Sequence, residues 1–194
     1  MFKKVVWLAV LALALPLTAF ANNIDVSNRG GVISGSSSLS LSGSTMFAFG
    51  STVGTDLGSV SFTTGAFTSG NAQMGGTLAA GGSFTITGNG SHGVPNGVIF
   101  SGSFSSATWT LVTLANGTHN YTLTGALVDA SGRVGATTQI TVNTGTSLFS
   151  GSAGLSSGNT NVNLFAVPEP GTLSLFGTGL IGLVGTMLRK WRLT

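Results

Sequence analysis

Side chains that could act as acids, bases or nucleophiles are scarce in this sequence and stand far apart. Between residues 22 and 166 the ionisable candidates are His92, His119, Asp25, Asp56 and Asp129. Serines are so abundant that they cannot mark a Ser-His-Asp set, and no predicted helix exists for a Gly-x-Ser-x-Gly elbow to precede. Both histidines stand beside Asn-Gly dipeptides, which are typical of surface turns. The sequence therefore predicts no catalytic residues, and we do not expect an enzyme.

A metal centre is not expected either. The two histidines lack the short spacing of a zinc site, and the few acids are not clustered as calcium would require. The sequence has no cysteine, which excludes thiolate metal sites, cysteine nucleophiles and a disulfide scaffold. We accordingly predict no metal and no cofactor.

Two aromatic residues are candidate contacts for a carbohydrate. Trp109 and Tyr121 are the only Trp and Tyr of the middle region, and an exposed aromatic ring offers a flat apolar face to a sugar ring. The alternative is that both lie in the core, because Trp109 and Leu111 share one face of a period-two pattern.

Charge is sparse and is concentrated at the two ends of the chain. Charged residues make up 6% of the sequence, against roughly 25% in a typical soluble domain. The middle region carries only two arginines against three aspartates, so it has no basic patch for phosphates and nucleic-acid binding is excluded. The 12 Phe and the 42% apolar content argue against a disordered chain.

The N-terminus has the features of a signal peptide over residues 1–21. Lys3 and Lys4 precede an apolar stretch, and Ala19 and Ala21 supply the small-x-small cleavage site. The apolar stretch is shorter than the roughly 20 residues that span a bilayer. We therefore expect signal peptidase to cleave after Ala21.

The C-terminus combines three features in a fixed order. Pro168, Glu169 and Pro170 form a stiff, extended segment within a predicted linker, residues 159–171, because each proline fixes φ and disfavours helix before it. The uncharged stretch 172–188 that follows would give a helix of roughly 25 Å, the short end of a membrane span. The basic end, residues 189–194, contains Arg189, Lys190 and Arg192. It should stay in the cytoplasm as a membrane stop, which leaves the preceding chain outside.

This tail resembles the PEP-CTERM sorting signals. In that family Pro-Glu-Pro is followed by a short hydrophobic helix and an Arg-containing basic cluster, and all three parts are present here. The resemblance implies recognition and cleavage by exosortase, an integral membrane transpeptidase-like protease, in a Gram-negative bacterium that makes exopolysaccharide. A plain C-terminal anchor behind a Pro-rich linker is the alternative.

Residues 22–158 show the period-two alternation of β-strands. Val60 and Phe62 alternate with serines, and Phe84 and Ile86 alternate with threonines. Val98, Phe100 and Phe104 share one face of a further run, and Trp109 follows in the next run. Asn-Gly and Gly-Gly pairs separate such runs, as tight hairpins require. We predict an all-β domain, an antiparallel β-sandwich or flattened barrel, between a signal helix and a transmembrane helix. A parallel β-solenoid is the alternative.

Together these features predict an exported surface or matrix protein that is structural within an exopolysaccharide or biofilm matrix. It would be anchored transiently in the inner membrane and then reach the cell surface. Its expected partners are signal peptidase, exosortase and extracellular polysaccharide. Two alternatives remain open: a carbohydrate-binding module or adhesin, and a self-assembling β-fibre protein that pairs through sparsely charged strand edges.

Overall fold

The computed structural model describes residues 21–130, 132 and 134–165, and this part of the chain is built from β-strands. The strands are β1 (Ala21–Arg29), β2 (Val32–Ser34), β3 (Ser40–Phe49), β4 (Thr52–Thr64), β5 (Phe67–Asn71), β6 (Gly75–Leu78), β7 (Gly81–Asn89), β8 (Asn96–Thr113), β9 (His119–Asp129), β10 (Val134–Asn143) and β11 (Ser152–Phe165). Their alternating apolar and hydroxyl side chains suit a pleated sheet that is buried on one face.

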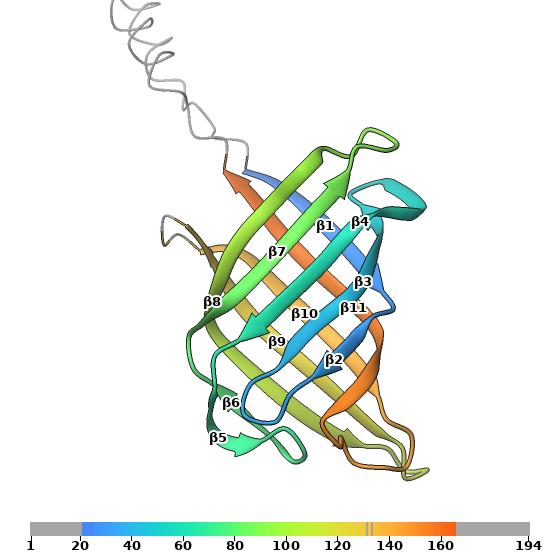
Figure 1. Cartoon of the computed structure of the whole chain (residues 1–194), viewed down its shortest axis with the longest axis vertical. Coiled ribbons are helices and arrows are strands. Elements are labelled where there is room, and N and C mark those ends of the chain that lie inside the picture. Colours follow the sequence, from blue (N-terminus) through green and yellow to red (C-terminus); the bar gives the residue numbers. More distant parts are fainter. Residues whose placement is uncertain (1–20, 131, 133, 166–194) are drawn as a thin grey trace, which may run out of the picture. The chain divides into compact units, whose positions relative to one another are not determined.

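Eight of these strands close into an antiparallel barrel (Figure 1). They follow the order β8-β7-β4-β3-β1-β11-β10-β9, and pairing of β9 with β8 completes the circle. β2 continues the line of β1 between β3 and β11. A barrel of eight strands is narrow enough for its own side chains to fill it.

The closure of the sheet into a barrel distinguishes between the architectures that the sequence predicted. The all-β class and the antiparallel barrel are confirmed, whereas the β-sandwich and the parallel β-solenoid are wrong. The prediction of free edges for fibre assembly is also wrong for the barrel strands, because closure pairs both edges of the sheet. β5, five residues long, ends the sheet beside β6 and has no second neighbour in the strand order.

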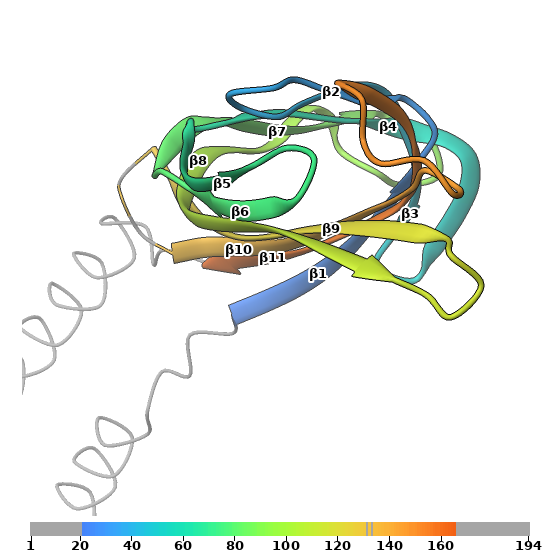
Figure 2. The ribbon, with the colours of Figure 1, turned by 90° about the horizontal axis from the view of Figure 1, so that it is seen from below.

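The two ends of the barrel differ. β1 begins and β11 ends at the upper end in Figure 1, where the β3–β4 and β7–β8 hairpins also lie. The lower end carries the β2–β3 loop, the β8–β9 turn and the β10–β11 loop. Seen from below in Figure 2, the β5–β6 hairpin lies across this lower end. β6 joins the barrel there through β8, with Thr77 opposite Thr108.

The barrel interior holds two aromatic clusters. In one cluster, Phe62 and Phe84 stack at 5.8 Å, and Phe104 meets both rings edge-on. Near the lower end, Trp109 stacks on Tyr121 at 5.2 Å, and Phe149 from the β10–β11 loop meets both. The rings of both clusters are buried, so the described domain has a continuous hydrophobic core without disulfides.

Bulges change which residues of β8 face inward. The sequence predicts Val98, Phe100 and Phe104 on one face, with Trp109 in a separate strand. Instead one strand of 18 residues contains them all, and a register shift after Phe104 brings Trp109 inside. A second shift, opposite Ile86, turns Val98 outward, where 65% of it is exposed. An extra residue on one strand moves every following side chain to the other face.

The predicted segment boundaries are only partly within the described residues. β11 continues to Phe165, so strand replaces the first part of the predicted linker 159–171. Gly75 and Gly76, predicted as a turn, lie in β6. The remaining terminal predictions, the signal helix and the span 172–188, fall outside the described residues. Among the residues that are described, no helix is long and apolar enough to cross a bilayer.

Candidate functional site

The histidines and aspartates singled out from the sequence do not assemble into one site. His92 lies exposed in the β7–β8 hairpin with a left-handed φ of 54°, and His119 begins β9 at the opposite end of the barrel. The 18 residues of β8 separate them. The His119 Nδ1 atom lies 2.9 Å from the Thr113 hydroxyl across the β8–β9 hairpin. His92 is therefore a surface turn residue, as predicted, whereas His119 is the first residue of a strand.

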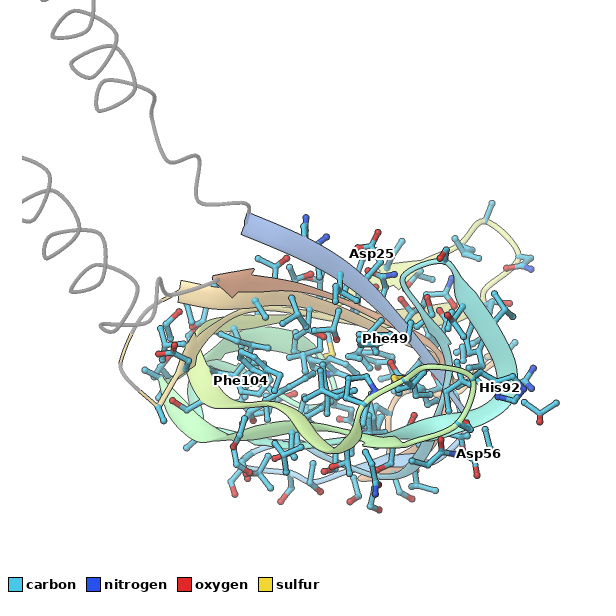
Figure 3. All side chains as sticks on the ribbon, turned by 90° about the horizontal axis from the view of Figure 1, so that it is seen from above. Asp25, Phe49, Asp56, His92 and Phe104 are labelled. Carbon is cyan, nitrogen blue, oxygen red and sulfur yellow. The ribbon has the colours of Figure 1, made fainter. Side chains whose placement is uncertain are left out.

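His92 and Asp56 lie on two neighbouring hairpins at the upper end (Figure 3), and the Ser91 hydroxyl lies 3.5 Å from the Asp56 carbonyl oxygen. Their hydrogen bonds do not form a catalytic relay. The Ser91 hydroxyl donates to the Asn89 side chain at 2.6 Å, and the Asp56 carboxylate accepts from the Gly58 amide at 3.1 Å. A Ser-His-Asp triad needs the serine bonded to the imidazole and the imidazole to the acid. These hydrogen bonds fix the hairpins instead.

The described acids lie on separate elements. Asp25 on β1 accepts a hydrogen bond of 2.6 Å from the Asn161 amide, while Asp129 ends β9. Within the described part of the chain, no three metal-ligating side chains come together.

The sugar-contact hypothesis for Trp109 and Tyr121 is wrong in this structure, and the core alternative holds. Trp109 is 1% exposed and Tyr121 is 0% exposed, so neither ring presents a face to solvent. Both point inward because Trp109 opposes Leu123 and Tyr121 opposes Val142 on the inner face.

The polar tips of these two rings hold the loops of the lower end. The Trp109 indole donates to the Ala72 carbonyl at 2.8 Å, and the Tyr121 hydroxyl donates to the Gln73 carbonyl at 2.7 Å. The same hydroxyl accepts from the Phe149 amide at 3.0 Å. Hydrogen bonds from these core side chains thus hold the β5–β6 turn and the β10–β11 loop in place.

An open groove of about 460 Å³ lies between these loops. We call it the lower groove, and its lining residues are Gly35, Ser36, Asn71, Ala72, Gln73, Phe149, Ser150 and Gly151. They come from the β2–β3 loop, the β5–β6 turn and the β10–β11 loop. A hydrogen bond from the Gly35 amide to the Gly151 carbonyl joins two of these loops. No residue that lines the groove is charged.

The outer wall from β8 to β11 carries rows of uncharged polar side chains. One row runs across four paired strands through Thr108, Thr124, Gln139 and Asn159. The next runs through Thr110, Thr122, Thr141 and Ser157. All eight are partly or fully exposed. This wall offers hydroxyl and amide groups to water or to a ligand without attracting ions.

The C-terminal segment matches a known sorting motif. Residues 166–190 match the model of the PEP-CTERM protein-sorting motif. The chain carries a PEP-CTERM motif. Pro168, Glu169, Pro170, Arg189 and Lys190 fall inside the matched segment, as the sequence predicted. Arg192 follows it, and all six residues lie outside the described residues.

A PEP-CTERM motif implies an exported protein that exosortase processes. Comparison with curated proteins and with solved structures gave no match, so the barrel itself is assigned no function by similarity.

Sequence reasoning missed the lower groove. Its lining residues lie in three loops that are distant in the sequence, and none of them belongs to a recognisable motif. The only signal was indirect: Trp109 and Tyr121, singled out for another reason, anchor two of its three loops.

Proposed function

We propose that this protein is a non-enzymatic component of the cell surface or extracellular matrix, sorted by exosortase through its PEP-CTERM motif. The observation that carries the proposal is the match of residues 166–190 to that motif. Signal peptidase would first remove residues 1–21, and exosortase would then release the protein from the inner membrane of a Gram-negative host. The role that follows is structural, within an exopolysaccharide or biofilm matrix.

The position of the motif supports removal of the tail. The last strand ends at Phe165, and the matched segment begins at residue 166. Cleavage within the motif would therefore take no residue from β11, and every barrel strand would keep its hydrogen bonds. Tail removal need not unfold the domain.

The surface of the barrel supports a polysaccharide environment. The hydroxyl and amide rows on β8 to β11 can exchange hydrogen bonds between water and neutral sugars. Few fixed charges are present to bind ions or nucleic acid, since the region between residues 22 and 166 carries two arginines and three aspartates.

The test is to change the motif and follow size and location. Glu169→Ala and Pro170→Ala should leave export intact but prevent tail removal, so that a larger protein accumulates in the inner membrane. Asp56→Asn, which removes one carboxylate from the barrel, is the matched control and should be processed normally. Immunoblots of fractionated cells report the result. Normal processing of both motif variants would contradict the proposal.

A carbohydrate-binding role is the second candidate function. The lower groove favours it, because the groove is uncharged, open and lined by amide and hydroxyl side chains. Assembly into fibres through strand edges is not favoured, since the barrel leaves its own strands paired.

A further inference from the structure

We propose that the lower groove is a binding site for a short segment of a neutral polysaccharide. The inference rests on the proposed matrix function and names the ligand class and the place of contact. The groove volume of about 460 Å³ falls within the range of roughly 300–1,000 Å³ that is usual for ligand pockets. It is open on one side, so a chain longer than the groove could enter and leave along it.

The lining specifies a neutral ligand. The described charged residues Asp25, Arg29, Asp56 and Asp129 lie outside the groove lining. A uronate or phosphate would lose hydration there without meeting an opposite charge. The hydroxyl groups of a neutral sugar can instead bond to the side chains of Ser36, Gln73 and Ser150.

The β5–β6 turn is held in place before any ligand arrives. The Asn71 side-chain oxygen accepts from the amides of Gln73 and Met74 at 2.9 and 2.8 Å. The Asn71 amide nitrogen then remains available to donate, and the Gln73 backbone is fixed by the Tyr121 hydroxyl. Groups that are ordered in advance lose less entropy when a ligand binds.

The groove also has an apolar component. Ala72 and Phe149 line it but are only 7% and 2% exposed, so they offer a ligand little surface. The larger exposed apolar surface comes from neighbours in the sequence. Met74 and Leu148, which adjoin lining residues in the sequence, are 62% and 37% exposed. Sugar rings have apolar C–H faces as well as hydroxyl groups, so this mixture of apolar and amide surface suits them.

The groove and the outer ends of β1 and β11 lie at opposite ends of the barrel. β1 begins and β11 ends at the upper end of the barrel, whereas all three groove loops lie at the lower end (Figure 1). The points at which both terminal segments join the barrel are thus remote from the groove.

The experiment is affinity electrophoresis of the exported protein in native gels that contain dextran, galactomannan or alginate. We expect at least one of the two neutral polymers to retard the protein and the anionic alginate not to do so. The double variant Gln73→Ala/Ser150→Ala should lose at least tenfold in apparent affinity. The matched control, Ser61→Ala/Asn96→Ala, changes two exposed polar residues outside both the groove and the polar rows, and it should migrate as wild type does.

Three results would overturn the proposal: no retardation by either neutral polymer, stronger retardation by alginate, or equal losses in the groove and control variants. Gln73 and Ser150 are exposed, so thermal unfolding of the groove variant should match that of wild type and rule out misfolding. Tail removal in the same strains is a separate readout. Normal tail removal with no polymer binding would reject the groove and leave the sorting function intact.

Discussion

A single hydroxyl group joins two loops of the lower end. The Tyr121 side chain donates to the Gln73 carbonyl and accepts from the Phe149 amide, and the residue is 0% exposed. Because these backbone groups lie beside buried rings, loss of their partner would leave them without a hydrogen bond. An unpaired buried polar group costs about 1–3 kcal/mol.

Tyr121→Phe should therefore lower the free energy of unfolding by about 1–3 kcal/mol, since the ring remains and only the hydroxyl is lost. Urea unfolding followed by circular dichroism gives this quantity. Thr124→Ala on the exposed wall is the control and should change stability by less than about 0.5 kcal/mol. Equal midpoints for Tyr121→Phe and wild type would show that the hydroxyl does not hold the loops.

The role of a single residue could be predicted from the sequence only where its neighbours in the chain determined that role. Neighbouring Asn and Gly residues were sufficient to identify His92 as a turn residue, and period-two alternation favoured a core position for Trp109. His119, predicted in a turn by the same reasoning, is the first residue of β9. Neither pattern could show that Trp109 and Tyr121 point their polar tips at the β5–β6 turn. These two hydrogen bonds join residues that are 37 and 48 positions apart in the sequence, and no local sequence pattern relates them.

At the scale of the strand, a glycine on one strand leaves room in the barrel interior for a large side chain from the neighbouring strand. Gly125 on β9 faces inward beneath the Phe104 ring of β8. A Cβ at position 125 would come within 2.6 Å of that ring. Phe104 is only 1% exposed and packs against Phe62 and Phe84, so it has little room to move.

We expect Gly125→Ala to destabilise the domain by about 1–3 kcal/mol, the usual cost of overpacking a core. Gly154→Ala on β11 is the matched control. Nothing lies within 4 Å of a Cβ at that position, so its effect should stay within about 0.5 kcal/mol. Thermal or urea unfolding of the two variants measures these changes in stability. A Gly125→Ala protein as stable as the Gly154→Ala protein would contradict the packing described for β8 and β9.

Strands were predictable from period-two alternation, but bulges were not. Leu123, Leu127, Ile140 and Val142 are all buried, as the alternation indicates. β8 was divided in the prediction because its apolar face changes after Phe104, and a change of face looks like the end of a strand. The extra residue, Ser105, has no opposite residue on β9, and this mismatch exists only in the pairing of the two strands.

At the scale of the whole molecule, closure depends on pairing between β8 and β9 and between β1 and β11. β1 and β11 come from opposite ends of the described domain, so alternation along the chain cannot distinguish a closed barrel from a sandwich. Sparse charge made edge-to-edge assembly a reasonable prediction. Closure removes the edges that this assembly needs.

We therefore expect the processed protein to be a monomer. Sedimentation velocity over a hundredfold range of concentration should give one unchanged sedimentation coefficient. A coefficient that rises with concentration would show that β5 or the exposed apolar residues mediate association, and it would restore the fibre alternative. Far-UV circular dichroism of the same sample should show β-structure with negligible helix.

The central claim is that this chain is cut at both ends and acts as the barrel alone. The most direct test is the intact mass of the protein recovered from outside wild-type cells. The account predicts a species that begins at Asn22, retains Phe165 and ends within or just after Pro168, Glu169 and Pro170. Recovery of surface protein whose mass still includes the basic end, residues 189–194, would contradict sorting by cleavage and favour a plain membrane anchor.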